Sequence, residues 1–472
     1  MATPGRHSSR NSGGITARLA DCIGSVDFRE LPEEVRAVAK VVVLDGLANI
    51  LAGSTQPLGE ILIRHISALG GVPTATIIGT AAKTNAPYAA YANAAFCHSM
   101  DYEAMWWPPT HPTSPVLPAL LALAEQEGLP GTRVMEALVV GFEVQGRLNL
   151  AVDWITEPYT YFHPPGTLGA IGSASACSKL LGLDPWETRM AIGIAASRTG
   201  GLWANTGSMT KSQHSANSAR AGVECTLLAR EGYTSNENII ENKTGGFGQL
   251  ILGEEADLEL IVKDFGKPYR MSDPGITIKR YPAQTTTHWS IDAALELRDR
   301  YKLKAADIRE VVVRVGFPNW SAHWPKPRSG LEGKFSIHYT VALALLDGKL
   351  TIDSFDDRRR FSPAVDSMLE KIAVIEDTTI PPGLDFAGTW ATVTVTLEDG
   401  TVVSARCERP RGRWDNPLTR EERMLKFYDC ALRVLEQSEA QQVVDLVEKF
   451  EALQEITGLM SLLQRKGSGR AG

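Results

Sequence analysis

Apolar positions recur at helical spacing through the first half of the chain. From about residue 30 to 255, apolar residues repeat with the three-to-four residue period of a helix face, and the breaks between runs are short. This pattern predicts helices over 116–127, 133–152, 167–181, 186–196 and 215–230. Glycine, alanine and serine dominate the run from 167 to 181, and such small residues let helices approach closely. We therefore expect an all-α bundle in this part of the chain.

Near residue 270 the pattern changes to a mixture of strand and helix periods. It predicts strands over 276–281 and 308–315, helices over 291–302 and 335–346, and a hairpin over 392–407 that turns at Asp399-Gly400. After Pro417 the helical period returns and continues to about residue 463. We expect these last helices to complete the first bundle.

The predicted fold class is mainly α, with an all-helical bundle domain built from both chain ends and an inserted α+β lid domain. The expected boundaries are 1–18 for a disordered or targeting tail, 19–269 for the helical domain, 270–412 for the lid, and 413–465 for the C-terminal helices. The Gly/Ser-rich end after Lys466 is expected to be disordered.

Composition adds that this is an ordinary globular protein. A chain of 472 residues, 43% hydrophobic and 22% charged, is long enough for two domains. The net charge of −7 and the absence of a basic patch with aromatic residues argue against nucleic acid as a partner. No apolar run approaches the ~20 residues of a membrane helix, so no membrane partner is expected.

The cysteines and the N-terminus bear on the compartment. Six cysteines lie far apart without a CxxC pair or a zinc spacing, which predicts reduced thiols in a cytoplasmic protein. The first twenty residues carry Arg6, Arg10 and Arg18 with serines and no acid, so a mitochondrial transit peptide is the alternative to a disordered tail.

The standard cofactor motifs are missing. The sequence has no Walker loop, no GxSxG, no HExxH and no GxGxxG. We therefore expect neither a metal nor another cofactor, and acid/base chemistry becomes the leading class of function.

The window from His98 to Pro112 is the first candidate site. It holds His98, Asp101 and His111 in a loop beside Trp106 and Trp107. A histidine next to a carboxylate can hold or release a proton near neutral pH, and bulky apolar neighbours strengthen such charge interactions. The alternative is that Asp101 only caps a helix and that His-Pro only forms a loop.

Two further windows carry candidate catalytic side chains. His163 directly precedes a Pro-Pro-Gly break and the small-residue helix, where the helix N-terminus favours an anion and disfavours a protonated ring. Lys211 follows in a polar loop before an apolar helix and is a candidate for binding a carboxylate or donating a proton. A packed turn histidine and a solvated loop lysine are the alternatives.

A third window offers cations for binding carboxylates. Lys279 and Arg280 leave a predicted strand, followed by Gln284 and by His288 at the start of the next helix. Because side chains alternate along a strand, only one of the two cations can face the site and the other should be solvated.

Together these windows resemble the MmgE/PrpD family, which includes 2-methylcitrate dehydratase, cis-aconitate decarboxylase and iminodisuccinate epimerase. The resemblance covers roughly residues 15 to 460. Its motifs are Asn93-Ala-Ala with His98 and Asp101, Thr110-His111-Pro112, Gly141-Phe-Glu143 with Arg147, His163-Pro-Pro, Thr206-Gly with Lys211, Lys279-Arg-Tyr-Pro-Ala, and Phe335-Ser-Ile-His-Tyr339 leading to Leu-Leu-Asp-Gly348. The phrases around Trp107-Pro-Pro-Thr-His-Pro and Phe162-His-Pro-Pro are most similar to the decarboxylase type.

The resemblance implies a helical domain, an α+β lid, a cleft between them, no cofactor and a homodimer. It also implies that Asp101, His111, His163 and Lys211 are catalytic. The sequence departs from the decarboxylases at two positions, Met105 in place of a threonine and Gln284 in place of a histidine, and the expected lid tyrosine is not evident between Trp320 and Trp324, where His323 lies. Loss of a hydroxyl at residue 105 would leave a substrate carboxylate unpaired, so we expect a substrate other than cis-aconitate itself.

We therefore expect a cofactor-independent lyase that acts on a small di- or tricarboxylic acid. His98, Met105, Lys279, Arg280, Gln284 and His288 are the expected substrate-binding residues. Fixed cations would hold carboxylates, and His163 or His111 would move the proton with Asp101 as orienting or opposite group. The alternatives are an epimerase or isomerase on the same scaffold and a non-catalytic binding protein with a vestigial pocket.

Overall fold

A computed structural model describes residues 13–106, 108, 110–152, 162–316, 320–377 and 389–465. Most of the predicted N-terminal tail, Trp107 and the Gly/Ser-rich end lie outside these residues. The first helix begins at Ile15, so it covers the last residues of the segment predicted to be a tail.

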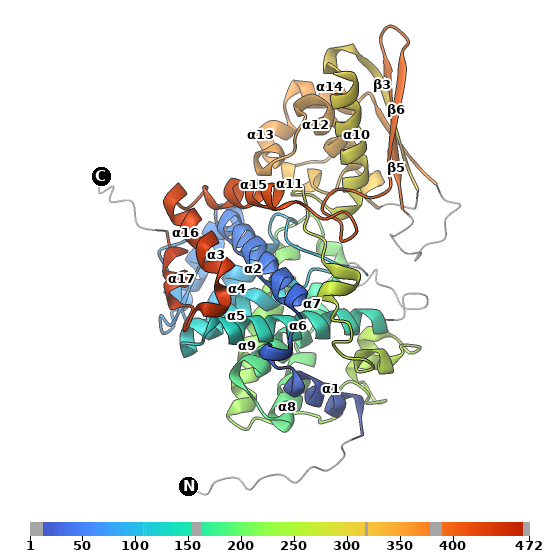
Figure 1. Cartoon of the computed structure of the whole chain (residues 1–472). Coiled ribbons are helices and arrows are strands. Elements are labelled where there is room, and N and C mark those ends of the chain that lie inside the picture. Colours follow the sequence, from blue (N-terminus) through green and yellow to red (C-terminus); the bar gives the residue numbers. More distant parts are fainter. Residues whose placement is uncertain are drawn as a thin grey trace, which may run out of the picture.

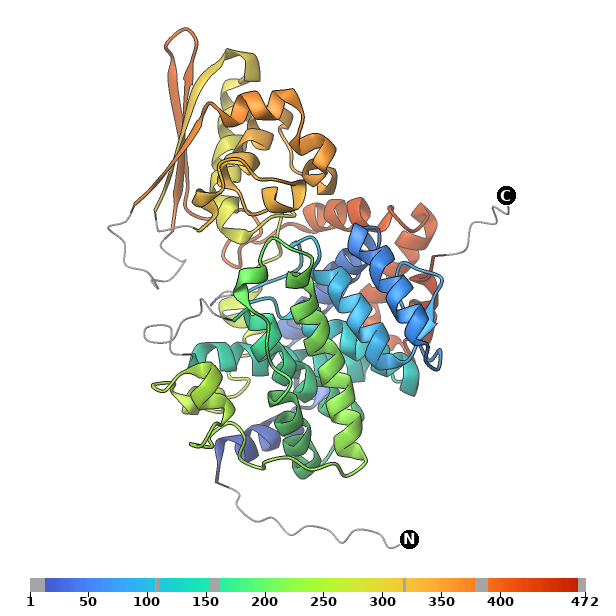
Figure 2. The same cartoon turned by 180° about the vertical axis from the view of Figure 1, so that it is seen from behind.

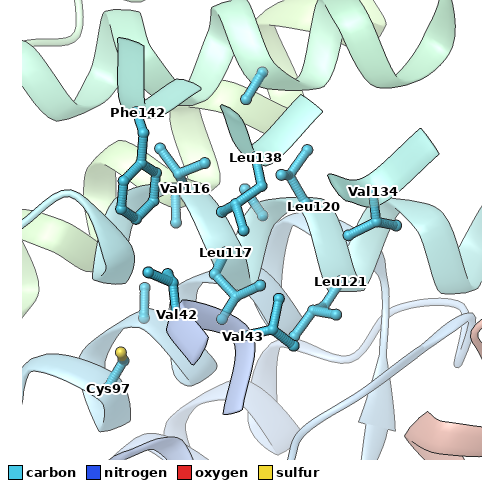
Figure 3. Close-up of a cluster of buried hydrophobic side chains, with 14 of the residues drawn as sticks. Val42, Val43, Cys97, Val116, Leu117, Leu120, Leu121, Val134, Leu138 and Phe142 are labelled. Carbon is cyan, nitrogen blue, oxygen red and sulfur yellow. The ribbon is translucent and has the colours of Figure 1, made fainter. Parts of the chain in front are cut away.

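The larger part of the molecule is a helical unit (Figure 1). Its helices are α1 (Ile15–Ser25), α2 (Glu33–Ser54), α3 (Pro57–Leu69), α4 (Ala86–His98), α5 (Thr113–Glu127), α6 (Gly131–Ala151), α7 (Pro164–Leu181), α8 (Pro185–Ala196) and α9 (Thr210–Arg230), with a small antiparallel pair of β1 (Ala75–Thr76) and β2 (Lys83–Thr84). Helices α4, α5, α6, α7 and α9 pack on one another in its centre. Figure 3 shows the apolar side chains, such as Leu117 and Leu138, that interlock between α2, α4, α5 and α6.

The C-terminal helices pack against this unit. α15 (Arg420–Ala431) and α16 (Gln437–Glu448) contact α2, while α17 (Thr457–Leu462) contacts α5. Both chain ends therefore contribute to one hydrophobic core, with Leu19 and Val43 from the start of the chain and Phe427 and Met460 from its end. Helix α2 lies beside α15 and α16 in both views (Figures 1 and 2).

Described apolar residues between Tyr281 and Ala405 form a second core around a four-stranded sheet. The strand order is β4-β3-β5-β6, with β3 (Ile308–Val315) parallel to β4 (Ile372–Glu376) and antiparallel to β5 (Ala391–Leu397), which forms a hairpin with β6 (Val402–Cys407). Helix α10 (His288–Tyr301) packs on β5 and β6 and α12 (Ile337–Asp347) packs on β4, accompanied by α11 (Gly330–Gly333), α13 (Asp357–Arg360) and α14 (Pro363–Leu369). This unit is called the α+β unit below. Along β5, buried and partly exposed residues alternate, as expected for a sheet that packs against the core with one face.

The helical content and the small sheets confirm the predicted mainly α class. The five helices predicted in the first half are all present, and the predicted hairpin turns at Asp399-Gly400. The strand predicted over 276–281 is wrong. There the backbone makes only an isolated bridge between Thr277 and Met105, and Ile278 bonds to Gly412, because the chain is crossing from one core to the other.

Helix α9 begins five residues earlier than the predicted start at residue 215. Lys211 therefore lies in the first turn of a helix and not in a loop. Within the described residues, no helix combines the length and the apolar character needed to cross a membrane.

Candidate active site

Asp101 lies at the centre of a buried polar cluster between the two units. The loop after α4 holds it in a left-handed backbone conformation with φ of 53°, which costs energy for a residue with a side chain and so has to be held by its surroundings. Its Oδ1 accepts hydrogen bonds from Lys279 Nζ at 3.0 Å and from Lys211 Nζ at 3.2 Å. Lys279 Nζ also donates to the Asp101 carbonyl at 2.8 Å. One carboxylate thus fixes two ammonium groups.

The charges around Asp101 set its protonation state. Burial would raise the pKa of this carboxyl, but Lys211, Lys279 and His111 outweigh burial and hold the pKa well below its usual range. Asp101 is therefore ionised at neutral pH. For Lys279 the balance is opposite, because burial lowers the pKa of its ammonium group more than Asp101 raises it.

His98 occupies a fixed tautomer between a cation and a carboxylate. As the last residue of α4, it contacts Glu103 through Nδ1 and Lys211 Nζ through Nε2 at 3.0 Å. An ammonium group can only donate, so Nε2 accepts and Nδ1 carries the proton toward Glu103. Burial is the largest effect on this ring. Together with the charge of Lys211 it outweighs the charge of Glu103, keeps the ring neutral and lowers the pKa of His98 to about 4. Both nitrogens of His98 are occupied, so it orients Lys211 and has no nitrogen left for substrate.

His111 lies between two carboxylates. Its Nε2 is 3.4 Å from Asp101 Oδ1 and its Nδ1 is 3.3 Å from Glu103 Oε1. The second approach has ion-pair distance but not hydrogen-bond alignment, so the buried Nδ1 has no hydrogen-bond partner in the described part of the chain. Burial lowers the pKa of His111, and the charges of Glu103 and Asp101 raise it in part.

Glu103 is a site residue that the sequence reasoning missed. It is fully buried, and its Oε2 is also without a hydrogen-bond partner in the described structure. Burial would raise the pKa of Glu103, but His98 and His111 outweigh it and hold the pKa well below its usual value. The sequence signal was present, since Glu103 lies inside the histidine window and burying a carboxylate requires partners.

His163 joins the cluster from the other side. It is the residue before α7, and its ring lies 5.2 Å from His98 and 6.3 Å from His111 between centroids. Its Nδ1 is 3.2 Å from Nδ1 of His214, a second residue that the sequence reasoning missed. His214 lies one turn after Lys211 on α9, a spacing that places both on one helix face. Burial, followed by Lys211 and the other histidines, holds the pKa of His163 well below its usual value.

One subset of these groups has the composition of a metal site. His98, Glu103 and His111 each offer one ligand atom, and these atoms lie within 4.8 Å of one another. Two imidazoles and a carboxylate suit divalent transition metals. A metal on Nδ1 of His98 would turn the Nε2 proton toward the Lys211 ammonium, so this use of the residues conflicts with the hydrogen bond that holds Lys211.

Four predicted substrate-binding residues make no hydrogen bond or ion pair with the Asp101 carboxylate in the described structure. Arg280 is exposed and faces Asp292 at 3.9 Å, so Lys279 is the buried one of the two adjacent cations. His288 bonds to the Ala283 carbonyl at 3.3 Å, and burial together with Lys279 lowers its pKa to about 3. The Gln284 amide oxygen caps the short helix Thr285–Thr287, and Met105 contacts Thr285 at the edge of the same turn.

His323 does not supply the missing lid group. It is 66% exposed at its side chain and pairs with Glu376 at 3.1 Å. Residues 317–319, directly before the 320–324 segment, lie outside the described residues.

Comparison with known proteins identifies the family of this chain. The MmgE/PrpD N-terminal domain model matches residues 17–259, and the C-terminal domain model matches residues 281–452. The chain is 31% identical to the cis-aconitate decarboxylase of Homo sapiens over 463 residues, which is 95% of this chain and 94% of that protein. It is 28% identical to the cis-aconitate decarboxylase of Aspergillus terreus over 481 residues, covering 96% and 97%. It is 26% identical to the 2-methylcitrate dehydratase of Cupriavidus necator over 297 residues, which is 57% of each chain.

Both family models are thus matched in order, over the helical core and over the α+β unit with the helices that follow it. The chain belongs to the MmgE/PrpD family and is a lyase of that type.

Proposed function

We propose that this protein is a cofactor-independent lyase that acts on a small di- or tricarboxylic acid by acid/base proton transfer. The observation that carries the proposal is the convergence of Lys211, Lys279 and His111 around Asp101, with His163 beside His111. Full-length similarity to cis-aconitate decarboxylases supports the lyase class and favours a decarboxylase-like reaction.

The lysines would bind the carboxylates of the substrate. Lys211 and Lys279 are buried and held in place by Asp101. In a site of low dielectric, a fixed ammonium group attracts a carboxylate strongly and loses little entropy on binding it. The same cations would stabilise negative charge that develops on the substrate during bond cleavage.

The two histidines suit opposite proton-transfer roles. His163 is surrounded by Lys211 and other histidines, which favour the neutral ring and therefore a general base. His111 lies between Asp101 and Glu103, whose charges favour the protonated ring relative to His163. Environments that push two titrating groups apart in this way distinguish the acid from the base. We assign His111 as the acid and His163 as the base.

Each possible cleavage uses this pair differently. In dehydration, His163 takes the proton α to a carboxylate while His111 protonates the leaving hydroxyl, and a C–O bond breaks. In decarboxylation of an unsaturated acid, the electrons of the broken C–C bond move into the allylic system as CO₂ leaves, and a histidine protonates the far allylic carbon. The residues are chemically competent for both.

A mass-spectrometric screen tests the proposal. The purified protein is incubated with a panel of di- and tricarboxylic acids that includes cis-aconitate and 2-methylcitrate, and products are scored for loss of CO₂ or water. We expect turnover of at least one acid. Stoichiometric binding without turnover would instead identify a binding protein. Deuterium uptake from heavy water without loss of CO₂ or water would identify an epimerase.

Substitutions test the residues. His163→Ala and Lys211→Ala should each lower turnover about a hundredfold or more, the usual scale for losing an acid/base group. Lys304→Ala, an exposed lysine of the α+β unit, serves as the matched control and should keep full activity. Full activity in both site variants would refute the assignment.

A further inference from the structure

The described chain buries four lysines, Lys211, Lys279, Lys334 and Lys426. Three of them pair with a carboxylate, because Lys211 and Lys279 contact Asp101 and Lys426 contacts Asp45. Lys334 has no carboxylate within 4.0 Å among the described residues. A buried ammonium group without a counter-charge is costly, so its retention calls for a reason.

The surroundings of Lys334 leave its ammonium group incompletely bonded. Lys334 is 4% exposed, and its Nζ donates to the Pro282 carbonyl at 3.1 Å. The ammonium group also lies 4.5 Å from the centre of the Phe355 ring. An ammonium group has three N–H donors, so one carbonyl and one ring face leave donor capacity unused.

Lys334 belongs spatially to the Asp101 cluster. The Lys334 carbonyl accepts a hydrogen bond from the Gln284 backbone N–H at 2.9 Å. The ring of the next residue, Phe335, has its centre 5.6 Å from Lys211 Nζ. The charged groups that act on the ammonium group of Lys334 are Asp101, Lys279, Asp356 and Lys211. The α+β unit thus adds a third buried cation to a cluster that holds two carboxylates, Asp101 and Glu103.

We propose that Lys334 is a substrate-binding residue whose ammonium group binds a carboxylate of the polycarboxylate substrate. The cluster contains three lysines against Asp101 and Glu103, and a bound carboxylate would supply the missing counter-charge. The assignment rests on the proposed function, because it needs a polycarboxylate as ligand. It also gives the α+β unit a direct part in binding, since Lys334 directly follows α11 of that unit as its C-cap residue.

The protonation of Lys334 should report this binding. Burial, together with the nearby lysines, lowers the pKa of Lys334 to about 7 although Asp101 and Asp356 raise it. At pH 8 the free side chain is then about nine-tenths neutral. A bound carboxylate favours the charged form, so binding should take up close to one proton at this lysine.

Isothermal titration calorimetry provides the test, with tricarballylate and glutarate as non-reacting tri- and dicarboxylate probes. Titrations at pH 8 in two buffers of different ionisation enthalpy give both the affinity and the number of protons taken up. We compare the wild type with Lys334→Met, Lys334→Arg and the exposed control Lys304→Met. Methionine removes the charge at similar volume, and arginine keeps a charge that does not titrate.

We expect Lys334→Met to weaken the tighter-binding probe about tenfold or more and to remove the proton uptake due to this residue. Lys334→Arg should retain most of the affinity but lose that proton uptake. The melting temperature of Lys334→Met should not fall, because an apolar side chain of similar volume replaces a buried amine that has no carboxylate partner among the described residues. Lost affinity with an intact fold would therefore indicate binding and not misfolding.

Two results would overturn the assignment. If Lys334→Met binds the probes with wild-type affinity and proton uptake while the wild type turns over a polycarboxylate, the assignment of Lys334 is wrong and the proposed function stands. If the wild type neither binds the probes nor turns over any polycarboxylate, both fail together.

Discussion

Glu103 determines how His111 and His98 are held. It contacts Nδ1 of His98 and lies 3.3 Å from Nδ1 of His111, and it is fully buried. Its negative charge compensates the cost of burying a ring that must carry a proton. The partners of this carboxylate are the two histidines and the Ser114 hydroxyl, which donates to its Oε1 at 3.1 Å, so we interpret Glu103 as a positioning residue that tunes the histidines.

Glu103→Gln separates charge from shape at this position. The amide keeps the size and can still accept the His98 Nδ1 proton, but it no longer raises the pKa of His111. We expect the basic limb of the kcat/KM profile, where the acid loses its proton, to move to lower pH and turnover to fall about tenfold or more. Glu125→Gln, a buried carboxylate paired with Lys83 outside the site, is the control. An unmoved basic limb in Glu103→Gln would contradict the role of His111 as the acid.

At the scale of elements, the periodic pattern located the helices but not their polar first turns. The pattern detects a buried apolar face, whereas α9 begins with the polar residues Thr210 and Lys211, and Lys211 pairs with Asp101 in the site. The parallel strand β4 was also missed, since one short strand with alternate exposed residues carries a weak signal. Asp101, His111, His163 and Lys211 could be named from motifs. His214 and Lys334 emerged only from contacts between distant segments, and Glu103 from its burial beside His98 in the same loop.

The turn at residues 284–287 faces the loop that holds Met105, and this contact suits a role in specificity. Met105 contacts Thr285, the residue that follows Gln284, so positions 105 and 284 lie close together. We expect the double variant Met105→Thr, Gln284→His to gain cis-aconitate decarboxylation. The threonine introduces a hydroxyl in place of an apolar side chain, and the histidine introduces an imidazole in place of a capping amide. Itaconate formation, measured by mass spectrometry, checks this. Activity unchanged from the wild type would place specificity elsewhere in the α+β unit.

At the scale of the whole molecule, buried neutral histidines link folding to pH. Burial is the largest cause that lowers the pKa of His98, His214 and His338 to about 4 and that of His288 to about 3. In the unfolded chain these groups return to the ordinary value near 6.5. Between pH 6.5 and 4 the unfolded chain therefore binds more protons than the folded chain, and folding stability falls as the pH falls.

Thermal unfolding between pH 8 and 4 measures this linkage. We expect a nearly constant melting temperature above pH 7 and a decline below about pH 6.5, with each such histidine contributing up to about 1.4 kcal/mol per pH unit. Burial alone lowers the pKa of His338, which lies in α12 outside the Asp101 cluster. His338→Phe should therefore make the decline shallower by one histidine's share while leaving the site charges in place. A slope equal to that of the wild type would mean that His338 does not titrate between the folded and unfolded states in this window.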